Sequence, residues 1–149
     1  MKKSLMIIAS ILVCGIAGCA SKPQPPPQRF VSPDLVVGRT WGWEGTVTPV
    51  EMFDVSAPER YTVHLTVDGA VKVKFDCNSG NGSYRIVNNS FSVGRMEATK
   101  QACHDGNLPL ASHFVKQLQE AGGYYVADGK LYLELQGNAG AMRFRELKP

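Results

Sequence analysis

The stretch RYTVHLTVDGAVKVKF (60–75) most strongly limits what this chain can fold into, because its apolar residues alternate with polar ones. This two-residue period is typical of a β-strand that buries one face. The pair Asp68-Gly69 predicts a two-residue hairpin turn, because both turn positions favour a positive φ. We therefore expect an antiparallel hairpin. The apolar residues expected on its inner face are Tyr61, Val63, Leu65, Val67, Val71, Val73 and Phe75.

Three further stretches alternate in the same way, and the first two contain an Asn-Asn or Asp-Gly pair where a turn is expected. They are SYRIVNNSFSV (83–93), YYVADGKLYLEL (124–135) and AMRFREL (141–147). Each of the first two predicts a hairpin, and the last predicts a closing strand.

Residues 108–121 break this period, because their apolar side chains recur every three or four positions, as in an amphipathic helix. Asn107 can cap its start, Pro109 suits its first turn, and Gly122-Gly123 is expected to end it. The predicted fold is therefore mainly β (α+β). We expect a small antiparallel, barrel-like sheet of seven to nine strands with one covering α-helix.

The N-terminus reads as a lipoprotein signal peptide over residues 1–18. Two lysines precede an apolar run of about a dozen residues, too short to span a bilayer core of about 30 Å. The quartet Ile16-Ala17-Gly18-Cys19 resembles the bacterial lipobox, so Cys19 is the expected site of lipidation, with palmitate among its acyl chains. The alternative is an ordinary cleaved signal. Ala20, rather than Asp, implies sorting to the outer membrane.

Residues 19–34 are rich in proline and predict an extended tether before a single domain over 35–149. Removal of Lys2 and Lys3 with the signal peptide leaves 14 basic side chains against 13 acidic ones. A net charge near +1 gives no electrostatic reason to expect nucleic acid as a partner. The expected partners are the outer membrane, through the lipid on Cys19, and an envelope protein.

The cysteines predict one disulfide. Cys14 lies in the signal peptide and Cys19 carries the lipid, so Cys77 and Cys103 remain as a pair in an oxidising compartment. Closing a loop of about 27 residues would stabilise the fold by roughly 3.5 kcal/mol in the chain-entropy model. A cysteine nucleophile at Cys103, or a zinc site shared with His104, would need free thiols and is not expected.

The stretch FDCNSGNGSY (75–84) has the glycines but not the lysine or following helix of a phosphate-binding loop. Its Gly and Asn residues are expected to adopt left-handed backbone positions in a tight connection. Asn78 is expected to hydrogen-bond neighbouring backbone, with ligand contact as the alternative. We predict no catalytic residue, no metal and no cofactor.

The aromatic residues give the best lead for a ligand. Trp41 and Trp43 flank Gly42 in one expected strand, so both should project to the same side. They either pack in the core or form an apolar binding patch together with Tyr124 and Tyr125.

The order of four segments resembles the META/HslJ family. The segments are LVVGRTWGWEG near the start, FDCNSGNGSYRIVNNSFSVG, EATKQAC, and the final helix with its hairpin. The residues that match the family motifs are Gly38, Trp41, Cys77, Asn78, Gly82, Tyr84, Thr99 and Cys103. Asp76 stands where the family usually has Gly, Gln101 where it often has Met, and residues 47–59 do not align.

The resemblance implies a small barrel with a covering helix, and a loose association with envelope stress, drug tolerance and secretion. It implies no catalytic mechanism. We therefore expect a non-catalytic lipoprotein of the outer membrane that faces the periplasm and binds a protein or an apolar ligand. The alternative is an inhibitor of a hydrolase such as a lysozyme or protease, with EMFDVSAPER (51–60) as its protruding loop.

Overall fold

The structure is a computed structural model that describes residues 31–104 and 106–148. The expected signal peptide, the lipidation site Cys19 and most of the expected tether lie outside the described residues. The ten strands are β1 (Thr40–Val47), β2 (Met52–Asp54), β3 (Tyr61–Leu65), β4 (Ala70–Phe75), β5 (Asn78–Val87), β6 (Ser90–Val93), β7 (Glu97–Ala98), β8 (Ala121–Ala127), β9 (Lys130–Leu135) and β10 (Ala141–Leu147). The one α-helix of this part of the chain is α1 (Leu108–Gln119), and short 3-10 helices are η1 (Pro33–Leu35), η2 (Pro58–Arg60) and η3 (Gln136–Asn138).

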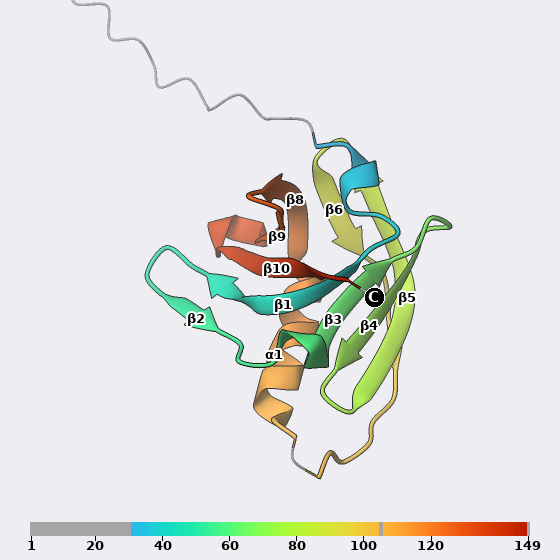
Figure 1. The fold of residues 1–149 in the computed structure, drawn as a ribbon, viewed down its shortest axis with the longest axis vertical. Helices are drawn as coiled ribbons and strands as arrows, with labels where there is room; N and C mark the ends of the chain where they lie inside the picture. Colours follow the sequence, from blue (N-terminus) through green and yellow to red (C-terminus); the bar gives the residue numbers. More distant parts are fainter. Residues whose placement is uncertain (1–30, 105, 149) are drawn as a thin grey trace, which may run out of the picture.

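Eight of these strands form a closed antiparallel barrel in the order β1-β3-β4-β5-β6-β8-β9-β10, and β10 pairs back with β1. The two short strands β2 and β7 pair with β1 and β5 on the same edges as β3 and β6, at positions that β3 and β6 leave free. Figure 1 shows the ring with β1 and β10 crossing its front. The predicted barrel-like sheet with one helix is therefore confirmed.

The barrel closes between the first and last of its strands, β1 and β10, which pair from Thr40↔Leu147 to Val47↔Ala141. The Arg39 guanidinium donates to both carboxylate oxygens of Glu146 at 2.9 Å, just before the first of these pairs. Both contacts come from the same nitrogen, Nη1, so this is one charge-assisted contact shared by the two oxygens rather than a fork of two nitrogens.

The core fills the barrel, and α1 packs across its inward-facing side chains. Phe114 of α1 is fully buried, and its ring lies 5.2 Å from that of Trp43 on β1 and 5.9 Å from that of Tyr61 on β3. Gln117 is also buried, and the Thr46 hydroxyl donates to its side-chain oxygen at 2.7 Å. The amide thus lies in the core without an unpaired acceptor.

Two of the three predicted turns have the expected form. Asp128 and Gly129 both have a positive φ, 51° and 71°, as a two-residue hairpin requires. Asn88-Asn89 is also a two-residue turn between the paired residues Val87 and Ser90, although of the two only Asn88 has a positive φ, 54°.

The turn at Asp68-Gly69 differs from the prediction. The Gly69 amide donates to the carbonyl of Thr66 at 3.2 Å, and only Gly69 of the two turn residues has a positive φ. The strands therefore end earlier than expected. Val67, which was placed on the inner face, lies in this wider turn and is 88% exposed.

The helix is shorter than predicted, because it ends at Gln119 and the chain enters β8 at Ala121. Gly122 and Gly123 are strand residues and do not terminate the helix. The start is as predicted, since the Asn107 side chain accepts from the Leu110 amide at 3.0 Å.

Candidate functional site

A groove with a volume of about 1150 Å³ lies on the outer face of β8 and β9. Leu131, Leu133 and Leu135 of β9 are buried in the core, so Tyr132 and Glu134 between them project outward and line the groove. The β5–β6 turn forms one wall, and η3 forms another.

The groove exists because β6 and β8 meet at a single residue pair, Ser90↔Gly123. The Tyr124 amide donates to the Asn89 carbonyl at 3.1 Å, and the Ser90 hydroxyl donates to the Gly122 carbonyl at 3.3 Å. These bonds hold the turn against the start of β8, while the rest of β8 continues beside β9. The turn consequently borders the outer face of both strands.

Two glycines at the base of the groove leave space that side chains would otherwise fill. A β-carbon on Gly123 would lie 2.6 Å from Oε2 of Glu134, and one on Gly122 would lie 3.0 Å from Cγ of Gln136. The first distance would require the end of the Glu134 side chain to move, and the second is tighter than most β-carbon contacts. The bare backbone therefore leaves room for the Glu134 carboxylate above it.

Tyr125 and Tyr132 form a stacked pair on this face. They are cross-strand partners in β8 and β9, their ring centroids lie 4.6 Å apart, and their planes differ by 4°. Burial, followed by the neighbouring Tyr132 and Glu134, raises the pKa of Tyr125 above its ordinary value. Its phenol is thus protonated at neutral pH and can donate a hydrogen bond.

The lining of the groove carries little charge. Glu134 is the only charged side chain among the described residues that line it. The other polar lining groups are neutral, and they include the side chains of Asn88, Ser90, Gln136 and Asn138. The site is thus suited to a ligand without negative charge.

Of the four aromatic residues predicted to bind a ligand, only Tyr125 lines the groove. Trp41, Trp43 and Tyr124 are 2%, 0% and 1% exposed and lie in the core. The Trp41 indole donates to the Val36 carbonyl at 2.9 Å, and the Tyr124 hydroxyl donates to the Val31 carbonyl at 2.7 Å. The core interpretation of the tryptophan pair is therefore the one that fits, and neither indole faces the surface.

Trp43 differs from Trp41 in one respect. Its indole Nε1 is buried and has no hydrogen-bond partner among residues 31–104 and 106–148. Its ring is packed among those of Phe53, Tyr61 and Phe114, at centroid distances of 5.2 to 6.0 Å. Aromatic packing thus holds this side chain without a polar contact.

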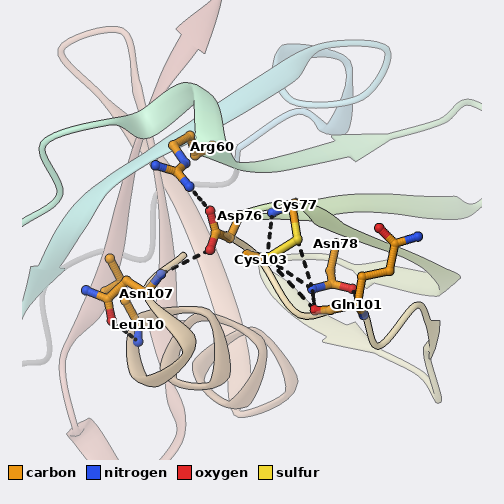
Figure 2. A network of polar contacts seen from close by, with 8 residues as sticks. All are labelled: Arg60, Asp76, Cys77, Asn78, Gln101, Cys103, Asn107 and Leu110. Atoms are coloured by element: carbon orange, nitrogen blue, oxygen red, sulfur yellow. Dashed lines mark hydrogen bonds and ion pairs between the residues drawn. A yellow bond between two sulfur atoms is a disulfide. The ribbon is translucent and has the colours of Figure 1, made fainter. Parts of the chain in front are cut away.

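Three of the family-motif residues, Cys77, Asn78 and Cys103, lie together at the start of β5, as Figure 2 shows. Cys77 and Cys103 are joined by the expected disulfide. Asn78 is buried, and its side chain donates to the Gln101 carbonyl at 3.0 Å and accepts from the Gln101 amide at 2.7 Å. The Thr99 hydroxyl also donates to Asn78, at 2.9 Å. Asn78 therefore binds backbone, and the motif has a structural role.

The glycines of this motif act differently from the prediction. Gly80 and Gly82 belong to β5 and do not adopt left-handed conformations. A β-carbon on Gly80 would lie 3.0 Å from the Glu97 carbonyl oxygen, and one on Gly82 would lie 2.8 Å from that of Arg95. Glycine is thus needed because the segment before and within β7 crosses closely over β5.

Asp76 occupies the left-handed position of this region, with a φ of 64°. Its side chain is 1% exposed, forms an ion pair with Arg60, and accepts from the Asn107 amide at 3.0 Å. The carboxylate therefore links the β4–β5 turn to η2 and to the start of α1 (Figure 2). The positive φ explains why a related chain would carry glycine here.

The structure brings together no metal ligands of the kind considered from the sequence. Cys77 and Cys103 are bonded to each other, and the described ranges contain no group of three or more His, Cys, Asp or Glu that could hold a metal ion. The acidic residues of β1 and β2 are ion-paired: Glu44 contacts Lys130 at 2.5 Å and Arg143 at 3.2 Å. The residues Glu44, Asp54, Lys130 and Arg143 do not line the groove.

The lining residues that the sequence pattern does not mark as site residues are Tyr132, Glu134, Asn88 and Gln136. The alternation of residues in β9 indicates part of the site, because it places Tyr132 and Glu134 on the face of the strand opposite the three leucines. Nothing local indicates that the 88–90 turn lies beside them.

An antiparallel barrel closed by its own end strands, with one helix over the core and a groove on its outer wall, places the chain among the small β-barrel domains. The chain belongs to the META domain family, whose model matches residues 37–148. This match lies within the domain expected over 35–149.

Two solved structures are similar in fold. One is the NMR structure of a protein from Burkholderia xenovorans, with a TM-score of 0.65 and 17% identity over 87% of this chain and 97% of that one. The other is the crystal structure of a DUF4847 family protein from Bacteroides vulgatus, with a TM-score of 0.57 and 12% identity over 78% of this chain and 98% of that one. A comparison with curated proteins finds no match. No helix in the described part of the chain has the length and apolar character needed to cross a membrane.

Proposed function

We propose that this chain is a lipid-anchored, non-catalytic binding domain of a bacterial envelope. The observation that carries the proposal is the groove over β8 and β9, which combines stacked tyrosines with neutral amides and one carboxylate. Aromatic surface with a few placed polar groups is typical of binding sites. The META domain family is not a known enzyme family, which is consistent with a binding role.

The anchor is inferred from the sequence before the barrel. A lipobox-like quartet ends at Cys19, and several acyl chains on one cysteine hold a protein stably at a bilayer. Ala20 favours the outer membrane, and the domain would then face the periplasm. Binding of an envelope protein or another ligand there would support envelope integrity under stress.

Replacing Cys19 tests the anchor. In Cys19→Ser we expect loss of metabolic labelling with palmitate and movement of the protein from the membrane fraction to the soluble fraction. Cys14→Ser is the matched control and should behave as the wild type. Labelling and membrane association that persist in Cys19→Ser would contradict the proposal.

Photo-crosslinking tests whether the groove is the binding surface. A crosslinking amino acid at Asn88, on the groove wall, should capture an envelope component in living cells. The same amino acid at Lys74, on the exposed face of β4, is the control and should not. Equal capture from both positions, or capture from Lys74 alone, would contradict this role of the groove.

An inhibitor is the second candidate, and the β1–β2 hairpin favours it. Residues 51–60 do not form one free loop, because Phe53 pairs with Thr46 and Val55 is buried. The tip of the hairpin nevertheless exposes apolar side chains: Val50 is 92% and Met52 59% exposed. If the tip enters an enzyme cleft, Val50→Ser with Met52→Ser should abolish inhibition of a lysozyme or protease panel, whereas Val67→Ser, at an exposed turn elsewhere, should not.

A further inference from the structure

We infer that the groove over β8 and β9 binds an uncharged, amide-bearing oligosaccharide. This inference rests on the proposed binding function and names its ligand class. It is drawn from the aromatic surface, the polar groups, the charge and the size of the groove.

The tyrosine pair supplies the apolar part of the recognition. Tyr125 and Tyr132 both line the groove and stack at 4.6 Å, so each ring restricts the movement of the other. A fixed aromatic surface binds with little loss of conformational entropy. The faces of sugar rings carry C–H groups that pack well on such a surface.

The polar groups supply both donors and acceptors. Side-chain amides at Asn88, Gln136 and Asn138 each offer two N–H groups and one carbonyl oxygen, and the Ser90 hydroxyl, which donates to Gly122, offers its oxygen as an acceptor. Hydroxyl and acetamido groups of a sugar present the same mixture of donors and acceptors. Glu134 adds one strong acceptor for a hydroxyl or amide N–H.

The charge selects against other envelope ligands. The lining contains a carboxylate and, among the described residues, no Lys or Arg, so phosphate, sulfate and acidic sugars would meet an unfavourable field. An acyl chain would leave the amides and the carboxylate buried without partners, which costs free energy. An uncharged, hydroxyl-rich chain satisfies the lining best.

The dimensions favour an oligomer over a single ring. The volume of about 1150 Å³ lies at or above the upper end of the roughly 300–1000 Å³ usual for small-molecule sites. The groove is bounded by the 88–90 turn and by η3, and is open to solvent above β9. Several linked rings fit such an open site better than one enclosed ligand.

The test is titration of the full chain, purified in mild detergent, with the tetramer of N-acetylglucosamine, followed by calorimetry and by amide NMR shifts. We expect saturable binding with shifts confined to β8, β9 and the 88–90 turn. Tyr132→Ala should weaken the affinity by about tenfold, as expected for a central aromatic contact. Glu134→Gln should weaken it less, and Glu97→Gln, on β7, is the matched control that should bind as the wild type.

A second variant guards against misfolding of Tyr132→Ala. Gln136 is exposed, so Gln136→Trp should fill the groove and abolish binding while the thermal unfolding midpoint stays unchanged. Absence of saturable binding, equal binding of a sulfated tetrasaccharide, or binding of an alanine tripeptide in its place would overturn the inference. If the tetramer fails while Asn88 still crosslinks a partner, the ligand class is wrong and the proposed binding function stands.

Discussion

Substitutions of Asp76 should separate the contribution of its carboxylate from that of its backbone conformation. The side chain is 1% exposed, pairs with Arg60 and accepts from the Asn107 amide, while the backbone has a φ of 64°. Asp76→Gly removes the carboxylate and suits this φ. Asp76→Ala removes the carboxylate and keeps a β-carbon where it is strained.

The magnitudes follow from these contacts. Hydrogen bonds to charged groups contribute about 1.5–3 kcal/mol each, but Arg60 is 42% exposed and regains water when its partner is removed. We therefore expect the carboxylate to contribute about 2 kcal/mol in total, and a left-handed β-carbon to cost about 1 kcal/mol more. Asp76→Gly should lower the free energy of unfolding by about 2 kcal/mol and Asp76→Ala by about 3 kcal/mol. Asp76→Asn, which tolerates this φ and keeps an acceptor, should lose about 1 kcal/mol.

Equilibrium unfolding in urea, with the disulfide intact and the buried tryptophans as the fluorescence probe, measures these differences. Asp128 is the matched control for the backbone alone, because it has a φ of 51° and an exposed side chain. Asp128→Ala should lose about 1 kcal/mol and Asp128→Gly almost nothing. A variant Asp76→Gly as stable as the wild type would refute the role given to the carboxylate, and equal stability of the Gly and Ala variants would refute the role given to the backbone.

Three further predictions concern the disulfide and the core. Replacing both Cys77 and Cys103 by Ser should lower the free energy of unfolding by about 3.5 kcal/mol, measured in urea against the oxidised wild type; a loss below about 1 kcal/mol would contradict the chain-entropy account. Trp41→Phe should destabilise more than Trp43→Phe by about 1 kcal/mol, because only the first leaves a buried carbonyl without its donor; thermal unfolding compares the two, and the reverse order would count against this reasoning. Burial raises the pKa of Tyr124 above 10.0, so the stability given by its neutral phenol is complete below pH 10 and is lost as the pH rises through the folded-state value. Alkaline unfolding followed by tyrosinate absorbance should therefore be less steep in Tyr124→Phe, and an unchanged profile would be inconsistent with this cause.

Local pattern was sufficient where one residue type dictates one conformation. The alternation of Leu131, Leu133 and Leu135 gave the inner face of β9, and Asp128-Gly129 gave its turn. The barrel with one helix followed from such elements, because alternating strands with polar outer faces must curl or be covered.

Local pattern failed where a distant segment determines the conformation. Gly122-Gly123 reads as a helix end, yet both residues lie in β8, where a β-carbon would crowd the side chains of Glu134 and Gln136. The glycines of β5 are needed by a crossing segment, which cannot be read from their neighbours. The groove was likewise unpredictable, because it depends on one pairing of β6 with β8 across an intervening helix.

Closure of the barrel by β1 and β10 also has a consequence for the order of folding. The two strands are joined across almost the whole domain, and the Arg39–Glu146 pair spans 107 positions. Contacts of such long range form slowly, and a chain made from its N-terminus lacks the partner of β1 until its final residues emerge. A product truncated before residue 141 would keep β1 and β9 as open edges that invite aggregation. Under the proposed export across a membrane, late ring closure would keep the chain unfolded, and so able to pass, until its synthesis is complete.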